Sequence, residues 1–271
     1  MKLARSILAD LKRVMVSPAF CSAVLLAAAV IFFSISQETD GWGDGYSVYY
    51  LLNVRYGISA FLPAMAVSAV LPFGLSYRED RKNGYLNCIL SREPAWVYCW
   101  SKVIVVWLTA VLVVFLGYLL AFGILSIKYP FLRTEDLEAL AQVDNYSLYE
   151  SLVFSRIPWL YLVCVCLTEA FGFGFMTVLT LTVSTKVKSP FLLLCVPLLF
   201  YELTVLALEW LKLPFIMNWI STMKDGGVFQ VIAPDIGICM LEVFGYFLTL
   251  SIFLGIVFTR VVTGRKGGGN S

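Results

Sequence analysis

The sequence contains no histidine and little charge of either sign, since Lys, Arg, Asp and Glu make up 14% of its 271 residues. Without histidine, zinc sites built on imidazole and reactions that need a histidine base are excluded. An intramembrane enzyme that relies on Glu alone is poorly supported. Because 60% of the residues are hydrophobic, too little polar surface remains to cover a soluble domain.

Two chemical motifs are also missing. The seven cysteines form no C-x-x-C pair and no pattern typical of disulfides. The chain has no G-x-x-x-x-G-K-[ST] phosphate loop, so it cannot bind and hydrolyse ATP in the P-loop manner by itself. A glycine run near the C-terminus lacks the Lys-Ser/Thr pair of such a loop, and residues 264–271 are predicted to form a flexible tail.

Long runs of apolar residues are the dominant feature of the sequence. Each is close to the roughly 20 residues that a helix needs to cross a bilayer core, where a continuous run of this kind is helical. The six runs cover residues 19–36, 58–77, 103–127, 157–184, 190–211 and 243–262. They predict an all-α polytopic membrane protein, with one domain over residues 1–271 and six transmembrane helices.

Lys and Arg are distributed unequally between the two sides of these runs. Fourteen of the 20 lie on the side that holds both termini and the second–third and fourth–fifth connections. The other side holds Arg55, Lys128, Arg133, Arg156, Lys212 and Lys224. By the positive-inside rule, both termini are predicted to be cytoplasmic in a multi-pass protein of the cell membrane.

Two predicted cytoplasmic segments carry apolar or aromatic residues. Residues 1–17 repeat apolar side chains at helical spacing between basic ones, which predicts an amphipathic helix on the membrane surface, although a plain orientation signal is the alternative. Residues 78–102 form the longest cytoplasmic connection. Gly84 is predicted to interrupt helical structure there, and Glu93-Pro94 is predicted to begin a new helix. This connection fits either a projecting helix that a soluble partner pushes or a solvated loop with an interfacial aromatic belt.

Two predicted external segments also have local signals. Residues 128–156 form a loop in which capping residues near Thr134 and Ser147 indicate two short helices. Residues 212–242 are too apolar for a free loop, and a polar turn at 223–227 separates two apolar halves that are each too short to span. They predict a re-entrant helical hairpin in the outer leaflet, packed on protein.

Two acidic residues fall within the apolar runs, where charge is costly and usually functional. Glu169 lies near the middle of the fourth run and Glu202 near the middle of the fifth, and no Lys or Arg is expected at their depth. Either carboxyl group fits a translocation path, and either also fits a structural hydrogen bond between helices. The small residues Ala170 and Gly174 beside Glu169 predict close helix packing.

The order of these features resembles the permease subunits of type-2 ABC exporters. The shared features are a basic amphipathic N-terminal helix, six spans, a glycine-broken second–third connection and an apolar hairpin before the last span. Residues 181–191 are similar to the family's Ser-rich turn between the fourth and fifth spans. The closest local similarity runs from an acid through a glycine and two hydrophobic residues to R-x-P and a lysine, at Glu79, Gly84, Tyr85, Leu86, Leu90, Arg92, Pro94, Tyr98 and Lys102.

The resemblance implies a transport subunit without enzymatic activity, which forms the translocation path of an exporter by alternating access. ATP and magnesium would bind a separate ABC ATPase, and two permeases, identical or different, would assemble with two ATPases in the lipid bilayer, with no nucleic acid involved. The exported substrate could be a peptide antibiotic, a drug, or a lipid or polysaccharide precursor. The residues implied to couple to the ATPase are Glu79, Gly84, Tyr85, Leu86, Ile89, Leu90, Arg92 and Pro94.

The main alternative is a secondary transporter or channel that works without ATP. Inverted repeats or interrupted paired helices would favour it. Residues 1–135 and 136–271 show no convincing internal repeat. The amphipathic N-terminal helix also has no role in a transporter or channel of that kind.

Overall fold

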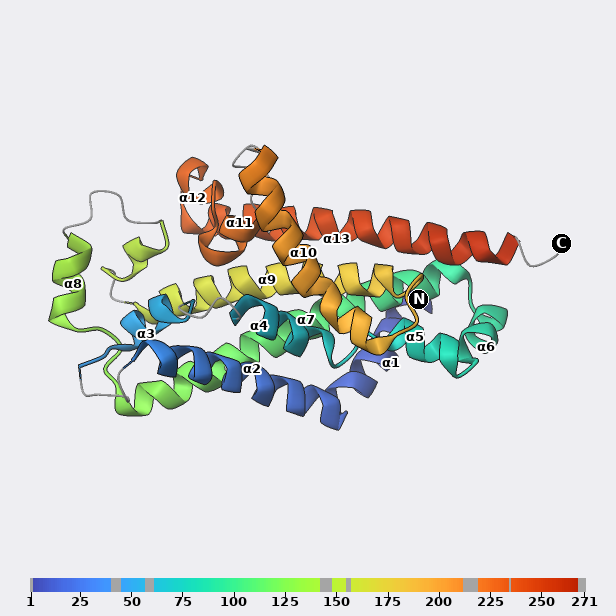
Figure 1. The fold of residues 1–271 in the computed structure, drawn as a ribbon, viewed down its shortest axis with the longest axis horizontal. Helices are drawn as coiled ribbons and strands as arrows, with labels where there is room; N and C mark the ends of the chain where they lie inside the picture. The colour runs from blue at the N-terminus through green and yellow to red at the C-terminus, as the bar shows by residue number, and fades with distance from the viewer. Residues whose placement is uncertain are drawn as a thin grey trace.

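A computed structural model describes residues 2–39, 45–56, 61–141, 148–154, 157–211, 219–233 and 235–267. These residues form an elongated bundle of helices, and the described part contains no strand. Most of the long helices run roughly along the bundle, whereas α10 (Pro190–Leu211) crosses it obliquely, and most of the short helices lie towards its two ends (Figure 1). The predicted all-α fold is confirmed.

Five helices are long and apolar enough to cross a membrane, judged by length and composition within the described residues. They are α2 (Pro18–Glu38), α7 (Ala95–Lys128), α9 (Trp159–Val183), α10 (Pro190–Leu211) and α13 (Ile236–Gly267). Each contains or closely matches one of the predicted apolar runs. The expectation of a membrane-embedded protein is therefore supported by five of the six runs.

The second run, residues 58–77, is not one continuous helix in its described part, which corrects the prediction there. Helix α4 (Phe61–Val70) ends before a turn at residues 71–75, and α5 (Ser76–Lys82) follows. Pro72 explains the break, because proline lacks an amide hydrogen and its ring clashes with the carbonyl four residues earlier. The Gly74 amide donates to the Val70 carbonyl oxygen at 2.8 Å and closes the turn.

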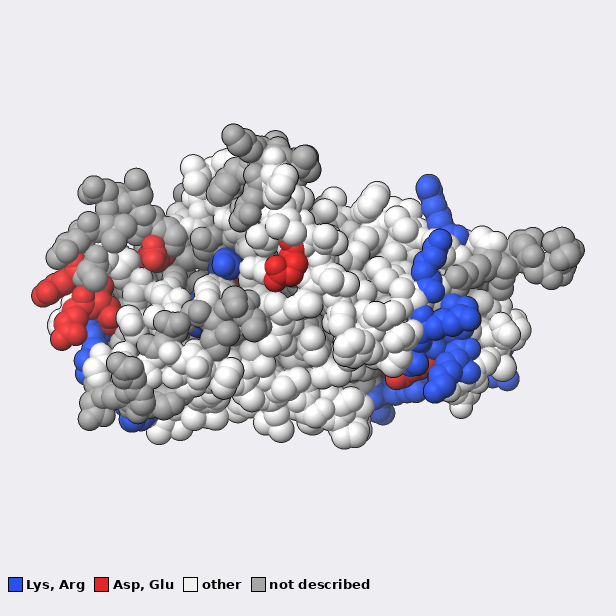
Figure 2. Space-filling view, viewed as in Figure 1, with Lys and Arg blue, Asp and Glu red and all other residues white. Residues whose placement is uncertain are grey.

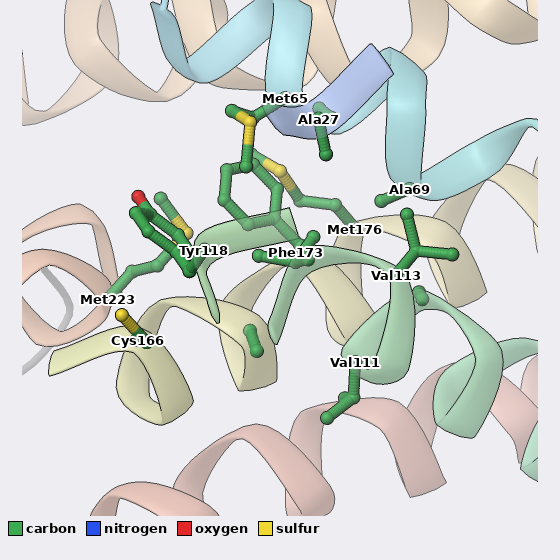
Figure 3. Packing of buried hydrophobic residues seen from close by; sticks show 14 of the residues in the cluster. Ala27, Met65, Ala69, Val111, Val113, Tyr118, Cys166, Phe173, Met176 and Met223 are labelled. Atoms are coloured by element: carbon green, nitrogen blue, oxygen red, sulfur yellow. The ribbon is translucent and has the colours of Figure 1, made fainter. Parts of the chain in front are cut away.

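The core lies around α9, which packs against α4, α7, α10 and α13. Buried side chains from several of these helices converge there, among them Met65 of α4, Val113 of α7 and Phe173 of α9 (Figure 3). The predicted close packing beside Glu169 is present at Gly174, where an added Cβ atom would lie 2.8 Å from Trp107 Nε1. Helix α10 and much of α13 are more exposed and lie at the periphery.

One end of the bundle holds α1 (Lys2–Met15), α5, α6 (Tyr85–Arg92) and the C-terminal part of α13 (Figure 1). The predicted amphipathic helix is confirmed as a helix, and Ser17 caps the start of α2 by accepting from the Phe20 amide. The predicted break at Gly84 is also present. Its φ of 75° places it in the left-handed region that glycine tolerates, between α5 and α6.

The opposite end holds α3 (Val48–Val54), α8 (Thr134–Ala141) and the 3-10 helix η1 (Glu150–Leu152). The helix predicted from Thr134 is confirmed. The region predicted as a hairpin contains α11 (Trp219–Asp225) and α12 (Phe229–Ile232), joined through Gly226 and Gly227. Helix α11 packs on α9 and α12 on α13, while residues 212–218 of the region lie outside the described residues.

Charge is segregated along the bundle. Lys and Arg gather over the end that carries α5 and α6, which we call the basic end, and most of the acidic surface in view lies at the end that carries α8 (Figure 2). The surface between the two ends is largely uncharged in this view. This distribution matches the asymmetry on which the predicted orientation rests.

The orientation can be tested with two cysteine positions. Cys88 on α6 is exposed at the basic end, and Glu135 on α8 is exposed at the other. We expect an impermeant maleimide to label Glu135→Cys in intact cells, and Cys88 only in inverted vesicles. Cys88→Ser provides the control for background labelling. The opposite accessibility of the two sites would reverse the orientation.

Candidate functional site

A buried ion pair lies inside the bundle. Arg55 follows α3 and is 2% exposed, and Glu169 near the middle of α9 is fully buried. The Arg55 Nη2 donates to Glu169 Oε1, and the Arg55 Nε lies 3.1 Å from the same oxygen. Two charges removed from water are tolerated only when they are paired and well hydrogen-bonded.

The remaining hydrogen-bonding groups of this pair also have partners. Tyr118 of α7 donates to the second Glu169 oxygen and accepts from Arg55 Nε at 3.2 Å. The guanidinium further donates to the Leu52 carbonyl and, at 2.7 Å, to the Tyr56 hydroxyl. The pair therefore fastens α3 to both α7 and α9 in the centre of the bundle.

The hairpin region approaches the same cluster. Lys224 of α11 places its Nζ 4.7 Å from the centre of the Tyr56 ring, in the geometry of a cation–π contact. Met223 of α11 packs directly on Gly172 of α9, where an added Cβ atom would lie 2.3 Å from its side chain. Two cations and one carboxylate thus lie in the half of the bundle nearer α8.

The expectation that Glu169 has no basic partner is wrong. Arg55 lies just before the second apolar run, so the sequence places it at the membrane edge, but its long side chain reaches inward to α9. One signal was present in the sequence: Arg55 is the only charged residue between Gly45 and Tyr56. A charge in so apolar a stretch needs a partner if the fold buries it, but the stretch does not identify that partner.

Glu202 has a different environment. It is exposed on α10, between the exposed Leu199 and Leu203. A carboxyl group on an outward apolar face is unfavourable in a bilayer unless another chain, water or a ligand covers it. The structure therefore does not bring Glu202 and Glu169 into one site within a single chain.

A second buried cluster lies at the basic end. Lys102 of α7 is 2% exposed, and its Nζ lies 3.0 Å from Asp80 of α5 and 3.4 Å from Asp10 of α1. Tyr98 donates to Asp80 at 2.9 Å. This set of four residues, which we call the Lys102 cluster, joins three helices that the sequence analysis treated separately.

Helix α5 also holds the connection between α9 and α10. Arg78 Nε donates to the Lys188 carbonyl at 2.6 Å, and Arg81 Nη1 donates to the Thr185 carbonyl at 3.3 Å. These bonds, the Lys102 cluster and a ring contact between Tyr77 and Phe258 link α5 to α1, α7, the α9–α10 turn and the C-terminal part of α13. A displacement of α5 would therefore also displace α1, α7 and the α9–α10 turn.

Helix α6 presents two distinct faces. Leu86, Ile89 and Leu90 are partly buried and pack against the core of the chain. Tyr85, which is 60% exposed, and Arg92 lie on the outward face. Helical spacing places Cys88 on that face as well, because it lies three residues after Tyr85 and four before Arg92.

The other residues implied to couple to an ATPase lie beside α6. Glu79 is exposed on α5, Gly84 is the exposed residue that joins the two helices, and the exposed Pro94 occupies the cap position of α7. They therefore surround α6 at the basic end. The side chains of Leu86, Ile89 and Leu90, by contrast, face inward and do not form part of the exposed surface.

A buried tyrosine links the opposite end to α9 and α13. The Tyr149 hydroxyl lies 3.1 Å from Thr168 Oγ1 and 3.1 Å from Met240 Sδ. Burial raises the pKa of the Tyr149 phenol well above its usual range, so it stays neutral and able to donate at physiological pH. It secures the start of α13 against α9.

Comparison with protein-family models, curated proteins and solved structures finds no match to this chain.

Proposed function

We propose that this chain is the permease subunit of a type-2 ABC exporter, driven by a separate ATPase that docks on the outward face of α6. The observation that carries the proposal is the arrangement of α5, α6 and α7 at the basic end. The short helix α6, which has an exposed face, lies between α5 and α7, and α7 is the longest apolar helix among the described residues. A short helix held between α5 and α7 in this way suits the transfer of motion from a soluble partner into the bundle.

The hydrogen bonds around α5 supply a route for that motion. A push on α6 reaches α5 across Gly84, and α5 is tied through Asp80 and Lys102 to α1 and α7. Buried charged contacts of this kind keep a fixed geometry, because breaking one leaves an unpaired charge. The three helices and the α9–α10 turn are then expected to move as one unit when the ATPase closes.

The translocation path is proposed to lie along the exposed face of α10. Glu202 lies on that face, and a second permease would remove it from lipid. In this arrangement both termini are cytoplasmic, the complex contains two permeases and two ATPases, and ATP with magnesium binds the ATPase. Glu169 stays a candidate path residue only if its pairing with Arg55 opens during transport.

The buried Arg55–Glu169 pair favours one alternative, a secondary transporter that works without ATP. Ionisable residues inside membrane spans are rare, and in transporters they mark ion pathways and proton relays. The two functions differ in one requirement: only the exporter needs a bound ATPase.

Cys88 allows this requirement to be tested directly. A photoactivatable benzophenone maleimide on Cys88, in a Cys21→Ser background, is expected to crosslink the chain to a protein that contains a P-loop. The copurified complex should hydrolyse ATP. The same probe on Glu135→Cys, at the other end of the bundle and in a background that also carries Cys88→Ser, should give no such product. Transport by the purified chain alone, without ATP, would favour the secondary transporter and contradict the proposal.

A further inference from the structure

A groove of about 380 Å³ lies between α12 and α13, outside both clusters described above. Its lining is mainly apolar and contains one charged side chain. The residues that line it are Phe229, Glu242, Gly245, Tyr246, Thr249 and Leu250. Five of the six lie on one face of α13, at spacings of three and four residues.

The Glu242 side chain is half-buried, and one of its two carboxyl oxygens lacks a partner among the described residues. Its Oε2 is buried, and within the described part of the chain it has no hydrogen-bond partner. A buried acceptor without a donor is unfavourable, and more so when it is charged. Because Glu242 lines the groove, a donor bound in the groove can reach its carboxyl group, and a cationic donor fits a carboxylate best.

The walls of the groove suit an organic cation. The Phe229 and Tyr246 rings lie 5.8 Å apart at an interplanar angle of 60°. Aromatic faces near a carboxylate stabilise an ammonium group by cation–π attraction. Beyond the groove, Phe253 follows Thr249 by one helical turn on the same face of α13 and is 63% exposed, which offers an apolar surface for a hydrocarbon chain.

The space beside Gly245 is open. A Cβ atom added there would meet no atom of the protein within 4 Å. The groove is therefore wide enough at this point to admit a ligand, and a larger side chain would fill it without a clash inside the chain.

We infer that this groove binds the ammonium group of an amphiphile, with the cation at Glu242 and the hydrocarbon chain along α13. Two sources share this chemistry: the headgroup of an amine-bearing phospholipid and a cationic amphiphile that is transported. The first source does not depend on the proposed function, whereas the second rests on it. Binding to the chain by itself is independent of any ATPase, so the two proposals can fail separately.

The inference can be tested with radiolabelled dodecylamine and, as a neutral match, dodecanol, on the purified chain in maltoside micelles. We expect saturable binding of dodecylamine in excess over dodecanol. Loss of one charge-assisted contact of about 1.5–3 kcal/mol should weaken binding to Glu242→Gln about ten- to a hundredfold. Gly245→Leu should abolish binding by filling the groove.

Gly264→Leu is the matched control, because it also lies on α13 and an added Cβ atom there meets nothing within 4 Å. It should bind dodecylamine as the unaltered chain does. The lipids retained on purification separate the two sources. A lipid site is identified if the unaltered chain retains phosphatidylethanolamine in excess over phosphatidylglycerol and Glu242→Gln does not. A site for a transported amphiphile is identified if dodecylamine binds without such an enrichment. Equal binding of dodecylamine and dodecanol, or binding unchanged by Glu242→Gln, together with no lipid enrichment, would overturn the inference.

Discussion

Replacing Arg55 with methionine is expected to destabilise the protein by about 3–5 kcal/mol, the usual effect of removing one partner from a buried ion pair. The Glu169 carboxylate would keep only its Tyr118 bond, in a fully buried position. Glu169→Gln should have a similar effect, because the guanidinium of Arg55 cannot lose its proton and would stay charged beside a neutral amide. Thermal unfolding in detergent and the yield of monodisperse protein measure the loss.

The double variant Arg55→Met with Glu169→Met separates pairing from packing. Apolar side chains of similar size often replace a buried ion pair with little loss, so most of the stability should return. Arg13→Met is a suitable control, since Arg13 is exposed on α1 and should tolerate the change within about 0.5 kcal/mol. Single variants as stable as the unaltered chain would show that the pair does not hold α3 in place.

The same double variant decides between the two roles of Glu169. If it is stable and still transports, the carboxyl group fastens helices and the path lies elsewhere. If it is stable and no longer transports, the Arg55–Glu169 pair belongs to the path. Variants of Glu169 alone cannot make this distinction, because each leaves Arg55 as an unpaired charge in the core.

The long helices could be predicted from the sequence because the bilayer imposes a length and an apolar composition on each. The run 190–211 coincides with α10, and the amphipathic pattern of residues 1–17 is realised as α1. The break in the second run could also be predicted from the sequence, because Pro72 interrupts a helix, although hydropathy alone does not indicate it. Local chemistry explains each of these features.

The clusters could not be predicted, because they join residues far apart in the chain. Arg55 and Glu169 are separated by 114 positions, and no local pattern pairs them. Lys102 counts as one more basic residue beside a span until the fold places Asp10 and Asp80 around it. Likewise, the apolar stripe of α6 shows that one face is buried, but not whether it packs on this chain or on a partner.

The burial of that stripe changes how coupling should be tested. Acidic substitutions at Leu86 and Leu90 would disturb the packing of α6 on its own chain, so a loss of transport would have two explanations. The outward face avoids this problem. Tyr85 and Arg92 are exposed there, so changing them leaves the packing of α6 intact.

We expect Tyr85→Asp combined with Arg92→Glu to detach the ATPase and abolish transport, while the permease itself folds and inserts normally. A large exposed aromatic residue and an arginine are the side chains that most often dominate an interface, and losing such an anchor commonly costs 2 kcal/mol or more, about a thirtyfold loss of affinity. Copurification of the ATPase and ATP-dependent transport in vesicles are the measurements. Thr263→Asp, exposed at the same end on α13, should change neither.

Lys102→Met combined with Asp10→Asn and Asp80→Asn distinguishes docking from transmission in the same assay. This triple variant leaves the outward face of α6 unaltered and removes the ionic link between α1, α5 and α7 without leaving an unpaired buried charge. The ATPase should therefore still copurify, and its hydrolysis should no longer drive transport. If the Tyr85 and Arg92 double variant binds the ATPase and transports as the unaltered chain does, α6 is not the docking site, and the case for an ABC permease loses the structural feature on which it depends.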